Sequence, residues 1–592
     1  MKIRYLNGSR LYFAVLAGGN AVIEDQSYLN KINVFPVPDA DTGTNLASTM
    51  RAIADGAEAH RSIKATLKSI ANAALSGAQG NSGLIFAQFI HGLSKEISHE
   101  SKLTTHAFAE SVKRAVQYAH KAIVHPVEGT MITVIRDWAE AVYERRSQTS
   151  DFVELMTDSL HAARNSLTET TQKLQVLARA GVVDAGAKGF VDFLEGILHY
   201  IKKGKFARPQ KAEIFWAQEE IKTPFKDKSL EFRYCSEALL TGSDLDPDAI
   251  RSVVQRFGES VVVAGSEERV RIHVHTNRPA ELFFELKDHG LMSQIKVDDM
   301  RRQYEAVHQR KAKIAIVTDS ACDLPPEVLD ERQIHVIPLT LSFGDQQFLD
   351  KVTIRPDQFY SLLETSPVHP KTAVPPVMTA QNLFSFLASH YDSIIAIILS
   401  DKLSGVHNMC LKAAAQIAGK KISVIDSRTI SAPLGLLVAK ASDMAEAGVP
   451  HAEIARTIEA AVPKTQLLVD VATMKYLVRS GRVSPVKGWI GRLLKVKPII
   501  TLDESGKATE IGKSFSRKAN MAKILAKVRK KAAERGLEGY AVVHARNPER
   551  AAVYGKRLTE LLGLAPAYIM DVAPVIGVHT GVGIVGVALL YK

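Results

Sequence analysis

The sequence has few cysteines, few aromatic residues and no long uninterrupted hydrophobic run. Only 3 of its 592 residues are cysteine, which excludes a disulfide framework and leads us to expect a cytoplasmic protein. Aromatic residues make up 7%, and the chain contains neither a stacking-aromatic motif nor a long Lys/Arg block. We therefore expect no nucleic-acid partner, although the formal net charge is +12.

Two apolar stretches resemble export or membrane segments only superficially. In residues 1–26 the apolar run is broken by Gly18 and Gly19 and is soon followed by acidic residues, so we do not expect a signal peptide. Residues 573–591 contain His579, several glycines and many β-branched residues, a pattern typical of buried strands.

The pattern of apolar residues divides the chain into regions, since 592 residues are too many for one core. Residues 1–200 show helical spacing and predict an all-α helical bundle. Residues 201–229 are charged and weakly periodic, as in a linker. Short β-type runs alternate with helices in residues 230–310, which predicts a small α+β domain. Apolar strands separated by helices in residues 311–592 predict an α/β domain with a largely parallel sheet.

The most informative segment of the helical region is the loop NVFPVPDADTGTN at residues 33–45. Its prolines stiffen the approach, and the carboxylates of Asp39 and Asp41 follow one residue apart. Closely spaced carboxylates suit Mg²⁺, a hard cation that prefers oxygen ligands and is commonly shared with phosphates. An Asp-rich turn that caps a helix has the same pattern, so the spacing alone leaves both interpretations open.

Further turns of small residues each precede a predicted helix. They are SGAQGNSG at 76–83, PVEGT at 126–130 and VDAG at 183–186. Backbone amides in such turns can approach a phosphate, and a helix N-terminus favours an anion. The chain has no Walker-type GxxxxGK[ST] motif, which excludes an ordinary P-loop.

In this order the segments resemble the nucleotide-binding (DhaL-like) domain of dihydroxyacetone kinases, in the variant found in the large subunit of bacterial fatty acid kinase. The resemblance covers about residues 1–200, with Ala40 in place of a family glycine. It implies an ATP site in which Asp39 and Asp41 hold Mg²⁺ and act in catalysis. The other residues that it places at the nucleotide are Asn33, Thr44, Asn45, Gly80, Asn81, Ser82, Thr130 and Asp184.

Polar turns also follow the apolar strands of the last region. They are TDSACDLP at 318–325, PKTAVP at 370–375, LSG at 403–405, SGR at 480–482 and GVHTG at 577–581. Hydroxyls, a fork-shaped Arg and an imidazole are the donors that a carboxylate head group needs. For His579 taken alone, a buried histidine with a satisfied core environment is the alternative.

Together these turns resemble the DegV family, which binds a long-chain fatty acid and serves as the small subunit of fatty acid kinase. The resemblance covers about residues 312–592. The pattern departs from the family at residues 373–374, 406–408 and 582, which leaves chain selectivity open. The resemblance implies that Arg482 is catalytic and that the carboxyl group is held by Thr372, Ser404, Arg482, His579 and Thr580.

The α+β region contains a candidate metal cluster. Side chains two apart on a strand face the same side, so His273 and His275 can share one ion with Cys235 from an earlier strand. Sulfur and two imidazoles suit Zn²⁺, although two strand histidines and a buried free cysteine have the same pattern. The region resembles the middle domain of the fatty acid kinase large subunit, in which a Cys and an HxH pair form a metal site.

These resemblances imply a fatty acid kinase that transfers the ATP γ-phosphoryl group to the carboxylate of a bound fatty acid and forms an acyl phosphate. A dihydroxyacetone-type kinase and a lipid-binding carrier or sensor with an inactive kinase half stay open as alternatives. The expected cofactors are ATP, Mg²⁺ and Zn²⁺. The expected partners are a long-chain fatty acid and a second copy of the chain in a homodimer. A downstream acyltransferase and peripheral membrane contact are left open.

Overall fold

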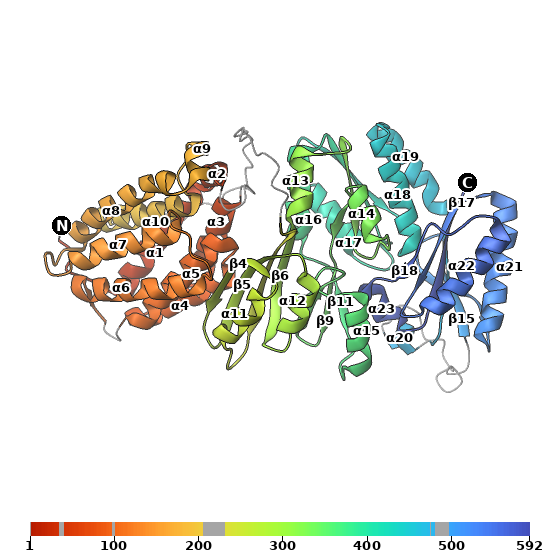
Figure 1. Ribbon diagram of the computed structural model, residues 1–592, viewed down its shortest axis with the longest axis horizontal. Helices are drawn as coiled ribbons and strands as arrows, with labels where there is room; N and C mark the ends of the chain where they lie inside the picture. Colours follow the sequence, from red (N-terminus) through yellow and green to blue (C-terminus); the bar gives the residue numbers. More distant parts are fainter. Residues whose placement is uncertain (1, 35–40, 98–100, 205–230, 474, 480–496) are drawn as a thin grey trace. The chain divides into compact units, whose positions relative to one another are not determined.

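The computed structural model describes residues 2–34, 41–97, 101–204, 231–473, 475–479 and 497–592. These residues form two compact units, Met1–Met300 and Arg301–Lys592 (Figure 1). The prediction of a multidomain chain with a helical first region and an α/β last region is confirmed. The boundaries predicted from the sequence stay predictions.

The first part of unit 1 is a helical bundle. Helices begin at ordinary cap residues: Ser62 Oγ accepts from the Ala65 amide at 3.3 Å, at the start of α4. On α6 the residues Phe108, Val112 and Ala115 recur at helical spacing and are all buried. The helices are α1 (Gly8–Glu24), α2 (Gln26–Lys31), α3 (Thr42–Gly56), α4 (Ile63–Gly77), α5 (Gly80–Glu96), α6 (Thr105–Ala122), α7 (Met131–Glu144), α8 (Phe152–Lys173), α9 (Gln175–Ala180) and α10 (Ala185–Lys203). A short pair, β1 (Tyr5–Leu6) and β2 (Leu103–Thr104), joins two ends of the bundle.

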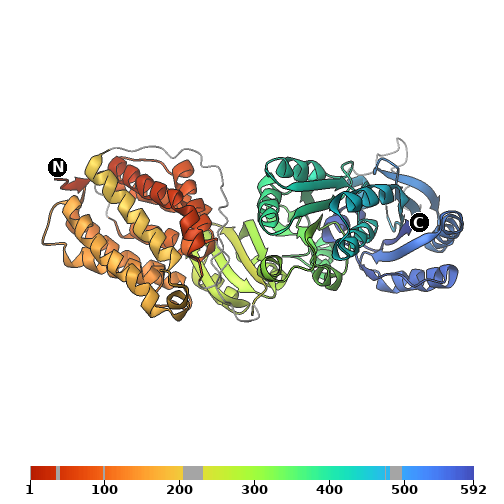
Figure 2. The same ribbon diagram turned by 90° about the horizontal axis from the view of Figure 1, so that it is seen from above.

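The second part of unit 1 is an antiparallel sheet in the order β4-β5-β3-β6. Val262 and Ala264 of β4 belong to the same buried core as the helices, and the Val124 amide donates to the Val261 carbonyl at 3.2 Å. One face of this sheet is therefore packed on the bundle, as Figure 2 shows. The elements are β3 (Tyr234–Thr241), α11 (Pro247–Gln255), β4 (Gly258–Gly265), β5 (Arg269–Thr276), α12 (Pro279–Leu286) and β6 (Leu291–Asp299). Helix α13 (Met300–His308) follows.

Unit 2 contains the expected parallel sheet, in the order β13-β12-β7-β8. Every residue of β12 is buried, as expected for a parallel strand covered on both faces. The strands are β7 (Ile314–Asp319), β8 (His335–Ile337), β12 (Ser393–Ile398) and β13 (Lys421–Asp426). The carboxyl ends of β7 and β12 meet at Asp319, whose carboxylate accepts from the Ala321 and Leu399 amides at 2.9 and 2.8 Å.

A second, six-stranded sheet in unit 2 differs from the expectation. In the order β16-β15-β14-β19-β17-β18 only the β17–β18 pair is parallel. The hairpin between β15 and β16 explains part of the difference, because Asp503 accepts amide hydrogen bonds across a turn in which Gly506 has φ of +86°. The strands are β14 (Thr465–Asp470), β15 (Lys497–Leu502), β16 (Ala508–Ser514), β17 (Leu537–His544), β18 (Ile569–Asp571) and β19 (Val585–Tyr591).

The remaining elements of unit 2 cover these sheets and form a small antiparallel sheet, β10-β9-β11. Its strands are β9 (Thr340–Phe343), β10 (Gln346–Leu349) and β11 (Lys371–Ala373). The helices are α14 (Pro326–Glu331), α15 (Pro356–Thr365), α16 (Val377–His390), α17 (Val406–Ala414), α18 (Ala432–Glu446), α19 (His451–Ala461), α20 (Lys475–Arg479), α21 (Arg517–Arg535), α22 (Pro548–Leu562) and α23 (Pro574–Thr580). None of the helices in the described ranges is long and apolar enough to cross a bilayer.

Candidate active site

The N-termini of four helices of unit 1 converge. A Cβ added to Gly186, at the start of α10, would lie 2.6 Å from Ser82 Oγ at the start of α5 and 3.4 Å from Met131 Cβ at the start of α7. A Cβ added to Gly80 would lie 2.3 Å from Asn45 Nδ2 near the start of α3. Each helix end carries free amides and a partial positive charge, so the convergence forms a region that favours an anion.

Asp41 precedes α3 but does not cap it through its side chain. This observation argues against the interpretation of the acidic loop as a capping turn, because the carboxylate stays available for another ligand. Thr44 is held by α2 instead: its Oγ1 accepts from Asn30 Nδ2 at 2.9 Å, and its amide donates to Asn30 Oδ1 at 3.0 Å. Asp39 lies outside the described residues. Asn33 is buried beside that segment.

The turn before α5 is tightly fitted. Gly80 has φ of +61°, and its contact with Asn45 leaves no room for a side chain, so glycine is required here. The neighbouring Asn81 has a buried side-chain oxygen, Oδ1, that has no hydrogen-bond partner among the described residues. An unsatisfied buried amide oxygen is costly, and it marks this turn as a place where a ligand completes the hydrogen bonding.

Thr130 and Asp184 complete this set. Thr130 Oγ1 donates to the Val127 carbonyl at 2.8 Å, and Asp184 Oδ1 caps α10 by accepting from the Ala187 amide at 2.8 Å. Burial raises the pKa of Asp184 to about 6, and hydrogen bonds from the amides of Ala187 and Met131 oppose the rise. The sequence-predicted nucleotide residues that the structure describes therefore gather at one end of the bundle, on the helix N-termini.

The structure also brings the predicted metal cluster together. One ligand atom each from Cys235, His273 and His275 lie within 4.8 Å of one another. His273 Nε2 is buried and has no hydrogen-bond partner among the described residues. Burial lowers the pKa of His275 to about 3, so its imidazole is neutral, the form that binds a metal. Burial raises the pKa of the Cys235 thiol well above its ordinary value. The donor set and the orphaned nitrogen fit a Zn²⁺ ion.

A residue that the sequence patterns did not single out lies beside this cluster. Glu237 Oε1 lies 3.0 Å from His273 Nδ1 and accepts from the Gly80 amide at 2.7 Å. Burial opposes ionisation of Glu237, but the hydrogen bond from His273 and the charges of Lys296 and Arg271 outweigh it and lower the pKa to about 2. The signal in the sequence was the alternation of Cys235 and Glu237 on one strand, which places both side chains on one face.

In unit 2 the predicted head-group residues come from separate elements. Thr372 Oγ1 on β11 lies 3.3 Å from His579 Nε2 on α23. The loop of Ser404 lies beside the end of β11, because a Cβ added to Gly405 would contact Val374 Cγ2 at 3.5 Å. Thr580 Oγ1 donates to the Ile576 carbonyl at 3.0 Å, which leaves its lone pairs but not its proton. Arg482 lies outside the described residues.

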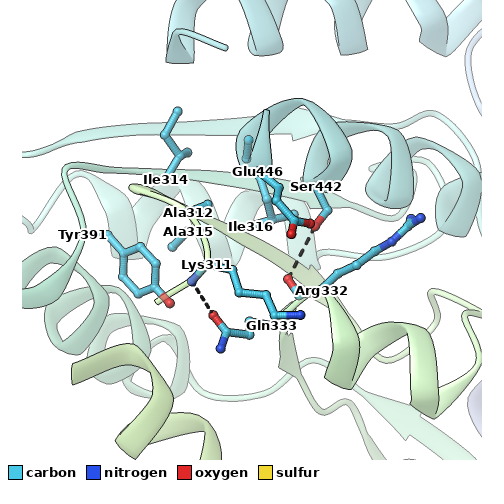
Figure 3. Close-up of a pocket in the computed structure, with 11 residues that line it drawn as sticks. Lys311, Ala312, Ile314, Ala315, Ile316, Arg332, Gln333, Tyr391, Ser442 and Glu446 are labelled. Atoms are coloured by element: carbon cyan, nitrogen blue, oxygen red, sulfur yellow. Dashed lines mark hydrogen bonds between the residues drawn. The ribbon is translucent and has the colours of Figure 1, made fainter. Parts of the chain in front are cut away.

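The cavities found among the described residues do not coincide with these polar groups. A cavity of about 10 Å³ in unit 2 lies at the amino end of β7, the edge opposite Asp319 (Figure 3). It has room for about one water molecule. Figure 3 shows that Lys311 and Gln333 close it through a hydrogen bond of 2.9 Å. A hollow of about 390 Å³ in unit 1 is lined by Ala52, Gly56, Ser69, Asn72, Ala73, Ser76, Gly77 and Arg269.

Comparison with known families divides the chain into three. The DAK2 domain matches residues 36–199, the FakA-like middle domain of fatty acid kinase matches residues 231–307, and the DegV family of uncharacterised proteins matches residues 313–592. The chain has the domain architecture of a fatty acid kinase. This confirms the three resemblances seen in the sequence. A DAK2 domain implies nucleotide binding, so the convergent helix ends lie in a nucleotide-binding type of domain.

Individual relatives match parts of the chain. Uncharacterised proteins of Staphylococcus aureus strains USA300 and NCTC 8325 are 32% identical over 323 residues, which are 53% of this chain and 59% of theirs. The chain thus spans 59% of the length of these relatives. Solved structures similar to its DegV domain include DegV, a fatty acid binding protein from Bacillus subtilis (28% identity, TM-score 0.44, 48% of this chain, 100% of that chain). Another is a fatty acid binding DegV family protein from Streptococcus agalactiae (24%, 0.44, 48%, 99%).

Proposed function

We propose that this chain is a fatty acid kinase in which kinase and lipid carrier are joined in one polypeptide. It transfers the γ-phosphoryl group of ATP to the carboxylate of a bound fatty acid, giving an acyl phosphate and ADP. The observation that carries the proposal is the presence of the DAK2 domain, the FakA-like middle domain and the DegV domain in one chain. A dihydroxyacetone-type kinase would not need the DegV domain.

The geometry of unit 1 supports ATP as the phosphoryl donor. The N-termini of α3, α5, α7 and α10 supply amides for the phosphates, and the orphaned Asn81 Oδ1 and the buried Asp184 offer oxygen atoms beside them. Asp41, together with Asp39 from the neighbouring segment, would hold Mg²⁺, which supplies neutralisation of phosphate charge when bound. Because these groups are fixed before the reaction, their contribution is positioning and electrostatic stabilisation.

The polar cluster of unit 2 supports a carboxylate as the acceptor. Thr372 and His579 are in contact, and Ser404 approaches from the loop after β12. Arg482, which the resemblance assigns to the same head group, would add a fork-shaped donor. A fatty acid has a pKa of about 4–5 and is ionised at neutral pH. The chain therefore needs no strong general base, and its residues hold the carboxylate oxygen in line for attack.

We further propose that Cys235, His273 and His275 bind one Zn²⁺ ion. The support is the three ligand atoms within 4.8 Å and the buried, unpartnered His273 Nε2 in the described part of the chain. A carboxylate that holds the other ring nitrogen, as Glu237 does, is the usual second partner of a metal-bound histidine.

A matched pair of substitutions at α3 tests the kinase assignment. Asp41→Asn should remove most ATP-dependent acyl phosphate formation while the protein stays folded, because loss of metal-held charge costs several kcal/mol of barrier, on the order of a 100-fold or larger loss in kcat. Asp55→Asn changes the same chemistry at an exposed position of the same helix and should keep full activity. Near-normal turnover in Asp41→Asn would refute the assignment.

A further inference from the structure

One face of the middle-domain sheet carries an ordered grid of reactive side chains. The strand register places Glu237 of β3 opposite His273 on β5 and Lys296 on β6, and it places Cys235 opposite His275 and Asp298. Because residues two apart on a strand share a face, all six side chains lie on the same side of the sheet. Lys296 Nζ and Asp298 Oδ2 form an ion pair at 2.7 Å at one edge of this grid.

This face is turned toward the start of α5. Val262, which is opposite His273 in the register, is buried in the core of the helical bundle. In the same row, Glu237 is 1% exposed and accepts from the Gly80 amide at 2.7 Å. The first amide of a helix N-terminus is therefore held by a middle-domain carboxylate, across 157 residues of sequence.

The same carboxylate oxygen also fixes a residue of the candidate metal cluster. Glu237 Oε1 lies 3.0 Å from His273 Nδ1, and the second carboxylate oxygen lies 3.6 Å from Arg271. With Nδ1 engaged by Glu237, the buried Nε2 of His273 is the nitrogen left for a cation. A cation on that nitrogen polarises the ring and strengthens the hydrogen bond on the other side.

We propose that Glu237 is a positioning residue that links the Cys235–His273–His275 cluster to the turn before α5, so that Zn²⁺ binding and nucleotide binding strengthen each other. The inference rests on the proposed nucleotide site. The cation restrains His273, His273 restrains Glu237, and Glu237 restrains the Gly80 amide. The neighbouring amides of α5 are then held in the geometry that receives phosphate. Binding free energies coupled in this way are reciprocal: each ligand must change the affinity of the other by the same factor.

Nucleotide binding without fatty acid tests the link apart from turnover. The full chain is stripped of metal and titrated with a non-hydrolysable ATP analogue at fixed Mg²⁺, with and without one equivalent of Zn²⁺. We expect Zn²⁺ to lower the nucleotide Kd on the order of tenfold in the wild type. In Glu237→Gln the ratio should fall to about one. Glu259→Gln changes an exposed glutamate on β4 of the same sheet and should behave as the wild type.

Two further measurements on the wild type keep the test decisive if Glu237→Gln loses its fold or its metal. The Zn²⁺ affinity must increase with bound nucleotide by the same factor, and hydrogen exchange at the Gly80 amide must slow when Zn²⁺ is added. A wild-type nucleotide Kd that is insensitive to Zn²⁺, or a coupling retained in Glu237→Gln, would overturn the link. Absence of any nucleotide binding would instead overturn the proposed function.

Discussion

Thr372 and His579 are 207 residues apart in the sequence, yet Thr372 Oγ1 lies 3.3 Å from His579 Nε2. One residue sits on a short strand of the small sheet, and the other sits near the end of α23. Both residues are only half-buried, so a ligand can reach them. A hydroxyl and an imidazole held together in this way are well placed to receive a carboxylate.

Removing the Thr372 hydroxyl should weaken fatty acid binding. Thr372→Val keeps the shape of the side chain and deletes one neutral hydrogen bond, which is worth about 0.5–1.5 kcal/mol, so the Kd for a long-chain acid should rise up to about tenfold. Copurified acid, measured by native mass spectrometry, should fall in parallel while nucleotide binding persists. Thr365→Val, at an exposed position ending α15, is the control and should retain its lipid. Equal lipid occupancy in both variants would contradict the head-group assignment.

The middle domain should contain about one zinc per chain. Elemental analysis of purified wild-type protein gives the stoichiometry, and a Cys235→Ser/His273→Ala double variant should lose the metal because it loses two of three ligands. His289→Ala removes another middle-domain histidine that lies outside the cluster and should retain zinc. A fully folded and active wild type without metal would remove the site from the account.

Stability should depend on pH through Asp184. Burial raises the pKa of this carboxyl from its ordinary value of 3.8 to about 6 in the fold. A pKa that is higher in the folded state contributes stability that is full below about pH 4 and is lost as the pH rises through about 6. Asp184→Asn does not titrate and still offers a capping oxygen to α10. Relative to the wild type, it should therefore gain up to about 3 kcal/mol in free energy of unfolding between about pH 4 and pH 7.

Denaturant unfolding followed by tryptophan fluorescence at several pH values measures this difference. The expected result is a gap between Asp184→Asn and wild type that widens as the pH rises. Two parallel pH profiles would mean that Asp184 is not held in a low-dielectric environment.

The sequence predicted helix starts better than it predicted their meeting. The turns around Gly80, Thr130 and Asp184 each carry the signals of a helix N-terminus, so their local structure follows from neighbouring residues. Their convergence depends on how the helices pack, which no local pattern encodes. Only the resemblance to a known family placed them in one site before the structure did.

Strand register explains what the sequence patterns did not reveal in the middle domain. The HxH alternation was visible within one strand, and it predicted correctly that His273 and His275 share a face. The role of Glu237 depends on β3 pairing with β5 and on the sheet packing against the turn at Gly80. Both are long-range contacts. The antiparallel second sheet of unit 2 was hidden for a similar reason, since buried strands of either kind are apolar.

Transfer should take place within one chain. A tether between kinase and carrier gives an effective concentration on the order of millimolar when the geometry allows the sites to meet. A mixture of an Asp41→Asn chain, which lacks the metal carboxylate, and a His579→Ala chain, which lacks a head-group residue, should then be no more active than its parts. Activity restored in the mixture, and appearing together with dimer formation, would mean that one chain serves the kinase of its partner.

The central claim is tested most directly by trapping the product. Purified wild-type chain is incubated with ATP, Mg²⁺ and a long-chain fatty acid in the presence of hydroxylamine, and the acyl hydroxamate is measured by mass spectrometry. The account predicts ATP-dependent hydroxamate in proportion to the ADP released, with both lost in Asp41→Asn. ADP release without hydroxamate, or no nucleotide turnover in a lipid-loaded wild type, would contradict it.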